Sequence, residues 1–157
     1  MKLIPMKQWV CDVCGEIIEK PEDGYVQWHR NSNGQIDDFI IVHHLTASSR
    51  KNHSGECYKY SSDRDLKSFL GEHGVLELHA LLDPGPYHMP ECNIFVTDIR
   101  KWIDFYKRLQ LPYYEEARQY WGRASHDGYF GDSNEIAIYL PENLKKMIEH
   151  YEKEDNY

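Results

Sequence analysis

The sequence has no long apolar run. No stretch of its 157 residues approaches the roughly 18 apolar residues of a membrane-spanning helix. Its first residues, MKLIPMKQW, also lack the longer apolar stretch of a signal peptide. Neither membrane insertion nor secretion is indicated, and we expect a cytoplasmic protein.

The sequence has no basic cluster either. It carries 18 Lys+Arg against 26 Asp+Glu, a formal net charge of −8, and the acidic excess lies mainly in residues 61–157. A duplex-binding protein usually needs a basic face that displaces counterions from phosphates, so nucleic acid is disfavoured as a partner. The small basic pairs at 100–101, 107–108 and 145–146 are instead typical of solvated helix faces.

Common catalytic motifs are absent as well. The sequence contains no H-E-x-x-H and no H-x-E with P-C-x-x-C, so familiar patterns of catalytic zinc are missing. It also contains no G-x-S-x-G, no G-x4-G-K-[ST] and no G-x-G-x-x-G. An enzyme is therefore not the first interpretation, although other catalytic arrangements are not excluded by missing motifs.

Cysteine is scarce, with 4 residues in the chain. In a reducing cytoplasm such cysteines serve more often as thiols or metal ligands than as disulfides. Hydrophobic residues, in contrast, make up 41% of the chain and include 12 Tyr, 5 Phe and 4 Trp. This composition predicts a folded chain with a packed core.

The first part of the chain has the pattern of a β-hairpin. Residues 24–30 and 37–44 are rich in aromatic and β-branched residues, and Asn33-Gly34 between them favours a tight turn. If these two residues are central, one face of the hairpin carries three predicted cross-strand pairs: Trp28 with Phe39, Val26 with Ile41, and Gly24 with His43. His43 then lies at the open end of the apolar face, and His44 points to the other face.

After residue 60 the apolar spacing becomes helical. Apolar residues at three- and four-residue intervals predict five helices, which we place near residues 62–70, 75–82, 97–106, 112–127 and 141–151. Ser62 and Thr97 are expected to cap the first and third. Residues 129–140 fit either a short strand or an apolar connector. We expect an α+β fold, with a β-rich zinc-binding module over 1–60 and a helical region over 61–157 packed on it.

The stretch WVCDVCGE contains a C-x2-C motif, formed by Cys11 and Cys14. Such a motif supplies two thiolates from one tight turn, and the β-rich part also contains Cys57 and several histidines. Together these residues predict a Zn²⁺ site. The Cys11-Asp12-Val13-Cys14-Gly15 turn resembles the knuckle of the zinc-ribbon and rubredoxin-like families, but the second C-x2-C of those families is missing. The whole chain is similar to uncharacterised bacterial proteins with a knuckle ahead of a helical region, a resemblance that implies no activity.

Three histidines are candidates for the fourth ligand. We favour His43, which lies at the hairpin end to which the chain returns from the knuckle. Gly24, the residue opposite His43, has no side chain and is expected to leave room for the knuckle. His53 is an alternative because its H-x3-C spacing to Cys57 needs only a local turn, and His44 is another. His88 and Cys92 share that spacing and leave a second, weaker metal site possible.

These observations lead to three hypotheses of function. The first is a zinc-stabilised binding or adaptor protein, with a protein partner and no membrane or nucleic acid. The second is a metal-dependent enzyme, such as a hydrolase, with an open zinc position. The third is a transcription-associated, nucleic-acid-binding module, which the fold analogy favours and the net charge opposes.

Overall fold

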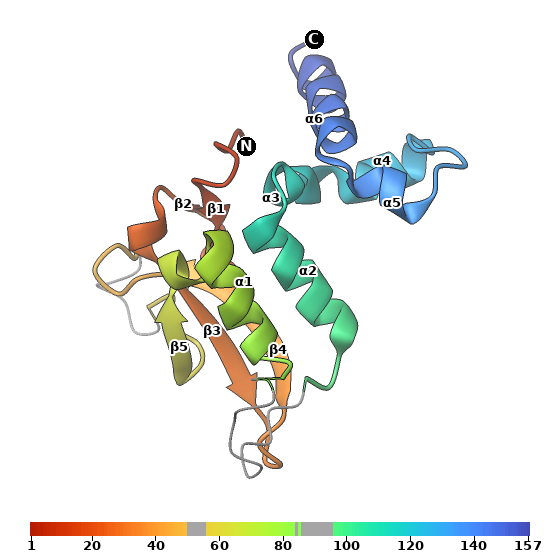
Figure 1. Ribbon diagram of the computed structural model, residues 1–157. Helices are drawn as coiled ribbons and strands as arrows, with labels where there is room; N and C mark the ends of the chain where they lie inside the picture. Colours follow the sequence, from red (N-terminus) through yellow and green to blue (C-terminus); the bar gives the residue numbers. More distant parts are fainter. Residues whose placement is uncertain (50–55, 84, 86–95) are drawn as a thin grey trace.

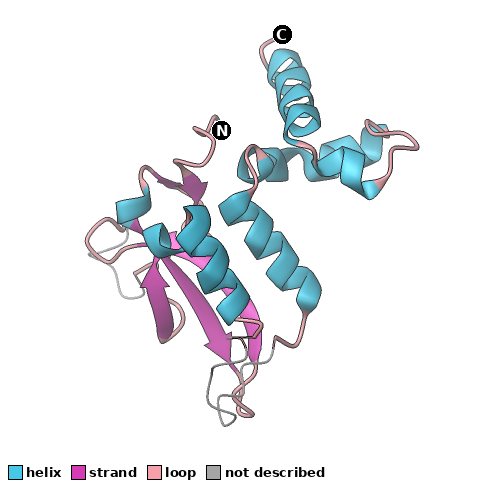
Figure 2. Cartoon of the chain, in the orientation of Figure 1, coloured by secondary structure: helices cyan, strands magenta, loops and turns pink. Residues whose placement is uncertain are grey.

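The computed structural model describes residues 1–49, 56–83, 85 and 96–157. Its strands all lie in the part of the chain before residue 66, and helices make up most of the part after it (Figure 2). This arrangement confirms the α+β class expected from the sequence. Five strands are present among the described residues: β1 (Trp9–Val10), β2 (Ile17–Ile18), β3 (Gly24–Arg30), β4 (Ile36–His43) and β5 (Ser62–Asp65).

Strands β3 and β4 form the predicted antiparallel hairpin. The predicted register is confirmed by the pairs Trp28 with Phe39, Val26 with Ile41 and Gly24 with His43. The turn differs from the expected two-residue form: the pairing shifts after His29, and residues 31–35 form a longer loop. In this loop the Asn31 side chain accepts hydrogen bonds from the backbone amides of Asn33 and Gln35, which stabilises the wider turn.

The prediction of a helix near residues 62–70 is wrong. Ser62–Asp65 is the edge strand β5, which pairs antiparallel with β3, and only the short 3₁₀ helix Leu66–Phe69 follows it. The backbone of β3 needs partners on both sides, and this long-range pairing outweighs a local capping pattern. The acidic residues of β5 lie on an exposed edge, where charge discourages further strand pairing.

Two helices cover the sheet. Helices α1 (Gly71–Ala80) and α2 (Ile99–Gln110) lie side by side over β3 and β4 (Figure 1). Phe39 of β4 stacks on Phe105 of α2 with ring centroids 4.9 Å apart. The predicted cap of α2 is wrong by one residue. The Asp98 side chain accepts from the amides of Arg100 and Lys101, whereas Thr97 donates to the carbonyl of Ile36.

The remaining helices form a second group. They are α3 (Tyr114–Ala117), α4 (Trp121–Asp127), α5 (Glu135–Tyr139) and α6 (Pro141–Asp155). The single helix predicted from Pro112 is thus divided: Tyr113 has φ of 69°, outside the helical region, and a 3₁₀ turn at Arg118–Tyr120 separates α3 from α4. The segment left open between strand and connector contains α5, whose first turn is capped by the Asn134 side chain.

The buried side chains form two clusters. The first contains buried residues from 9 to 109 and joins the sheet to α1 and α2. The second contains buried residues from 114 to 151 and joins α3, α4 and α6. The 3₁₀ helix Leu66–Phe69, α1 and α2 all contribute to the first cluster, so the proposed boundary at residue 60 falls inside it. The division of the chain into two domains at that residue stays a prediction.

Candidate metal centre

Four side chains with metal-binding atoms meet at one end of the sheet. The sulfurs of Cys11, Cys14 and Cys57 and a ring nitrogen of His43 all lie within 4.8 Å of one another. Cys11 and Cys14 come from the turn between β1 and β2, His43 from the end of β4, and Cys57 from the chain that precedes β5. Among the described residues this is the one group of three or more such side chains whose donor atoms converge.

The C-x2-C turn is closed by backbone hydrogen bonds. The amide of Cys11 donates to the carbonyl of Glu16, and the amide of Gly15 donates to the carbonyl of Cys11, each at 2.9 Å. Gly15 has φ of 76°, a left-handed conformation that glycine adopts without steric cost. The pairing of β1 with β2 then holds the two ends of the turn together.

His43 is held in one orientation by its second ring nitrogen. Its Nε2 lies 3.1 Å from the carbonyl oxygen of Ile17, and because a carbonyl oxygen can only accept, Nε2 carries the proton. In the neutral imidazole Nδ1 is then the acceptor, and it lies 3.4 Å from the sulfur of Cys14 and 3.8 Å from that of Cys57. This is the tautomer that a metal-ligating imidazole needs, with a carbonyl fixing the outer nitrogen.

The residues fit a tetrahedral zinc ion. Zn–S bonds of about 2.3 Å and Zn–N bonds of about 2.0 Å imply a sulfur-to-nitrogen separation of about 3.5 Å in a tetrahedron. The two separations from His43 Nδ1, 3.4 Å and 3.8 Å, lie on either side of that value. Three thiol sulfurs and one imidazole are also the donor set of many structural zinc sites.

Burial sets the chemistry of the cysteines. Cys11 and Cys57 are 1% and 0% exposed. Burial, reinforced by the neighbouring cysteines, raises the pKa of Cys57 to about 12, and a hydrogen bond from Ser48 opposes this rise. The thiolate form therefore needs a nearby positive charge, which a bound divalent cation supplies.

Ser48 also contacts the cysteine cluster, and no pattern in the sequence identified it. Its hydroxyl donates to the sulfur of Cys57 at 3.0 Å and accepts from the amide of Cys57 at 3.4 Å. The residue is 2% exposed, although it belongs to a polar stretch that has the composition of a surface loop. Nothing in its spacing distinguishes it from the serines and threonine beside it.

The space beside Gly24 is not occupied as the sequence predicted. The sequence suggested that this glycine, opposite His43, leaves room for the knuckle. A Cβ atom at Gly24 would instead lie 2.6 Å from Cδ2 of Leu66 and 3.3 Å from Cγ2 of Ile18. Leu66, from the 3₁₀ helix that follows β5, fills most of this space, because the chain after β5 folds back across the end of the hairpin.

Asp12 ties the knuckle to the strand that carries His43. Its carboxylate accepts from the amide of Ile41 at 2.7 Å, and its own amide donates to the carbonyl of Ile41 at 2.8 Å. The same carboxylate oxygen accepts from Nη1 of Arg108 at 2.7 Å. Helix α2 thus reaches the C-x2-C turn through one arginine.

The expectation that Lys107 and Arg108 form a solvated helix face is wrong. The Arg108 side chain is 3% exposed, and it donates to both carboxylate oxygens of Glu115, at 2.7 Å from Nε and 3.0 Å from Nη2. Lys107 is half-buried. Two carboxylates and the carbonyl of Val10 satisfy the guanidinium, which is why this charge can lie in the interior.

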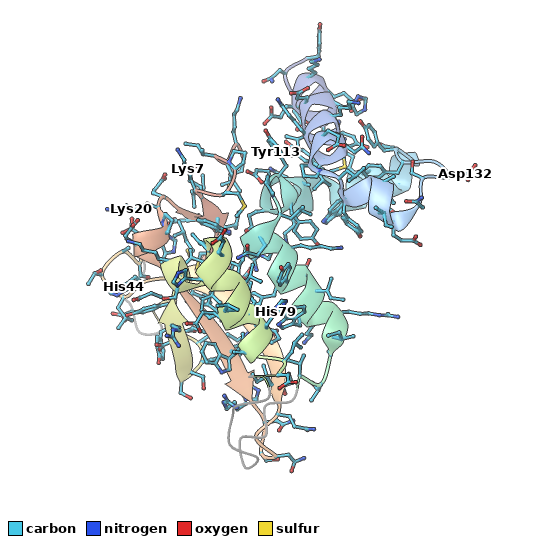
Figure 3. The ribbon with its side chains drawn as sticks, in the orientation of Figure 1. Lys7, Lys20, His44, His79, Tyr113 and Asp132 are labelled. Atoms are coloured by element: carbon cyan, nitrogen blue, oxygen red, sulfur yellow. The ribbon has the colours of Figure 1, made fainter. Side chains whose placement is uncertain are left out.

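His44, an alternative fourth ligand, has other partners. Both ring nitrogens of His44 have partners, because Nε2 lies 2.8 Å from the Tyr25 hydroxyl and Nδ1 lies 2.9 Å from Oγ1 of Thr46. Figure 3 labels His44 at the outer edge of the β-rich part. His53 lies outside the described residues, as do His88 and Cys92 of the second possible site.

Comparison with known proteins gives no relative from which a function could be transferred. No family model matches the chain, and neither the curated proteins nor the solved structures give a match. Within the described part of the chain, no helix combines the length and apolar character that crossing a bilayer requires. The function is therefore argued from the site and its surroundings.

Proposed function

We propose that this protein is a zinc-stabilised binding protein, in which Cys11, Cys14, His43 and Cys57 hold one structural Zn²⁺. The observation that carries the proposal is the convergence of four donor atoms within 4.8 Å, from three segments that are distant in the sequence. Thiolate and imidazole donors in this number suit zinc in tetrahedral coordination. Bound zinc would join the knuckle, β4 and the chain before β5.

The donor count favours a structural role over catalysis. A catalytic zinc usually has three protein ligands and keeps one position for water, whereas four protein ligands fill a tetrahedron. His43, Cys11 and Cys57 are each less than 6% exposed, so a substrate would have little access to a metal held among them. We therefore place the metal-dependent enzyme second, and the net charge of −8 places the nucleic-acid-binding module third.

The proposal is tested by metal content and thermal stability. Purified protein should contain about one zinc per chain by elemental analysis, and chelation should lower the melting temperature strongly, because binding free energy in such sites is largely folding free energy. Added zinc should restore it. A metal-free sample that melts at the temperature of the zinc-bound protein would overturn the structural role.

Cobalt substitution separates a closed site from an open one. Co²⁺ in a tetrahedral site with three thiolates should give strong visible absorption that does not change when azide is added, because no coordination position is free. A spectrum that shifts with azide would reveal an exchangeable position and favour the enzyme hypothesis.

A further inference from the structure

An apolar groove is lined by residues of α2, of α5 and of the chain beside them, and none of its lining residues belongs to the cysteine cluster. Figure 1 shows the positions of the two helices. The volume of the groove is about 620 Å³, which is within the roughly 300–1,000 Å³ typical of small-molecule sites. From α2 it is lined by Trp102, Ile103, Tyr106 and Lys107. These positions follow one another at the spacing of a single helical stripe.

The opposite wall comes from α5 and the residues that follow it. Its apolar lining residues are Ile136, Tyr139, Leu140 and Pro141, and Glu135 lies at the start of the helix. Ile136 is 78% exposed and Ile103 is 42% exposed, so large apolar side chains from both walls face solvent. A concave surface with such side chains is typical of a binding site rather than of random surface exposure.

Lys107 gives the groove its one positive charge. Its Nζ lies 3.5 Å from the ring centroid of Tyr139, and no carboxylate among the described residues lies within 4.0 Å of it. Burial lowers the pKa of Lys107, and the charge of Asp104 acts in the opposite direction. A half-buried ammonium beside aromatic rings, without an anionic partner, is complementary to an anionic group on a ligand.

We propose that this groove binds a monocarboxylate with an unbranched apolar chain, with its carboxylate paired to Lys107 and its chain lying between Ile103 and Ile136. A single cation suits a single carboxylate, and Glu135 on the other wall repels a second negative group. A partner helix would need a longer wall, because α5 has only 5 residues. The proposal does not depend on metal binding at the cysteines.

The test uses decanoate, decanol and decylamine, three ligands that share one chain and differ in their head group. In a calorimeter, each is titrated below its micellar concentration into the protein as purified. Decanoate should bind one to one, decanol about tenfold more weakly, and decylamine should not bind measurably, because its charge repels that of Lys107. Equal affinity for all three, or no binding of decanoate, would overturn the proposal.

Variants assign the effect to the groove. Lys107→Gln should weaken decanoate about tenfold and abolish its advantage over decanol. Lys101→Gln is the matched control, because Lys101 lies on the same helix outside the groove, where its ammonium pairs with Asp38. Ile136→Glu, at an exposed position, should prevent decanoate binding by charge repulsion. Unchanged decanoate affinity in Lys107→Gln would show that the head group binds elsewhere.

Discussion

The guanidinium of Arg108 donates a 2.7 Å hydrogen bond to the carboxylate of Asp12, the residue that follows the first cysteine of the knuckle. The same arginine binds Glu115 at the start of the second group of helices. One buried side chain therefore connects the C-x2-C turn, α2 and α3. Its removal would leave the buried carboxylate of Glu115 without its main partner and would take the ion pair from the carboxylate of Asp12.

Arg108→Met should lower the free energy of unfolding by about 3–5 kcal/mol, because breaking one side of a buried charge network leaves uncompensated charges. The measurement is urea denaturation with zinc present. Arg100→Met, at an exposed position on the same helix, is the control and should stay within about 0.5 kcal/mol of the parent. Similar losses in both variants would show that the network around Arg108 contributes nothing specific.

His43→Ala should strongly reduce zinc retention, because one of four donors is lost and the remaining thiolates keep an incomplete shell. His44→Ala removes the same chemistry from the opposite face of the strand and should retain zinc, since both of its ring nitrogens bind other groups. Zinc content is measured by elemental analysis after dialysis. His53→Ala completes the comparison: loss of zinc in that variant, with retention in His43→Ala, would make His53 the fourth ligand.

Glu116→Gln should change how stability depends on pH. Glu116 is 4% exposed, and both of its carboxylate oxygens are buried without a hydrogen-bond partner among the described residues. Burial, together with the charge of Glu115, raises the pKa of Glu116 to about 7. Because the folded protein holds this proton more tightly than the unfolded chain, stability falls as pH rises from about 4.5 to 7.

The Gln variant should remove this fall and be more stable than the parent at pH 8, by up to about 3 kcal/mol. Glu115→Gln is the matched control with the opposite sign. Burial opposes ionisation of Glu115, but Arg108 holds its pKa below the usual value. That variant should be less stable than the parent at pH 7 and lose this difference towards acid pH. At each pH the free energy of unfolding of the parent is subtracted from that of the variant. Any pH dependence that both proteins share, including that of the four candidate metal ligands, then cancels.

Gly74→Ala should destabilise the protein by about 1–3 kcal/mol, because a Cβ atom there would lie 2.1 Å from the backbone carbonyl of Phe69 and force the chain to shift. Gly122→Ala, in α4, meets no atom within 4 Å and should stabilise its helix by about 0.5–1 kcal/mol. Chemical denaturation of both variants decides this. A neutral Gly74→Ala would mean that α1 can move away from Phe69 at no cost.

The sequence alone determined the features that depend on local order. Alternating apolar residues and the Asn33-Gly34 turn were enough to predict the register that places His43 opposite Gly24 and turns His44 to the other face. The spacing of Cys11 and Cys14 identified the turn that carries two of the four converging donors. A change of period near residue 62 separated the strand-rich from the helical part, although it misassigned β5.

Tertiary structure decided the features that depend on which distant segments meet. Asp63 and Asp65 belong to a strand because β3 needed a partner, and no local signal records that need. Arg108 has the sequence context of an exposed basic pair, yet it is buried because Asp12 and Glu115 come from other elements to satisfy it. The hydrogen bond from Ser48 to Cys57 likewise depends on two separate segments of the chain meeting. Local periodicity records which face of an element is apolar, whereas a buried polar contact depends on two chain segments meeting in space.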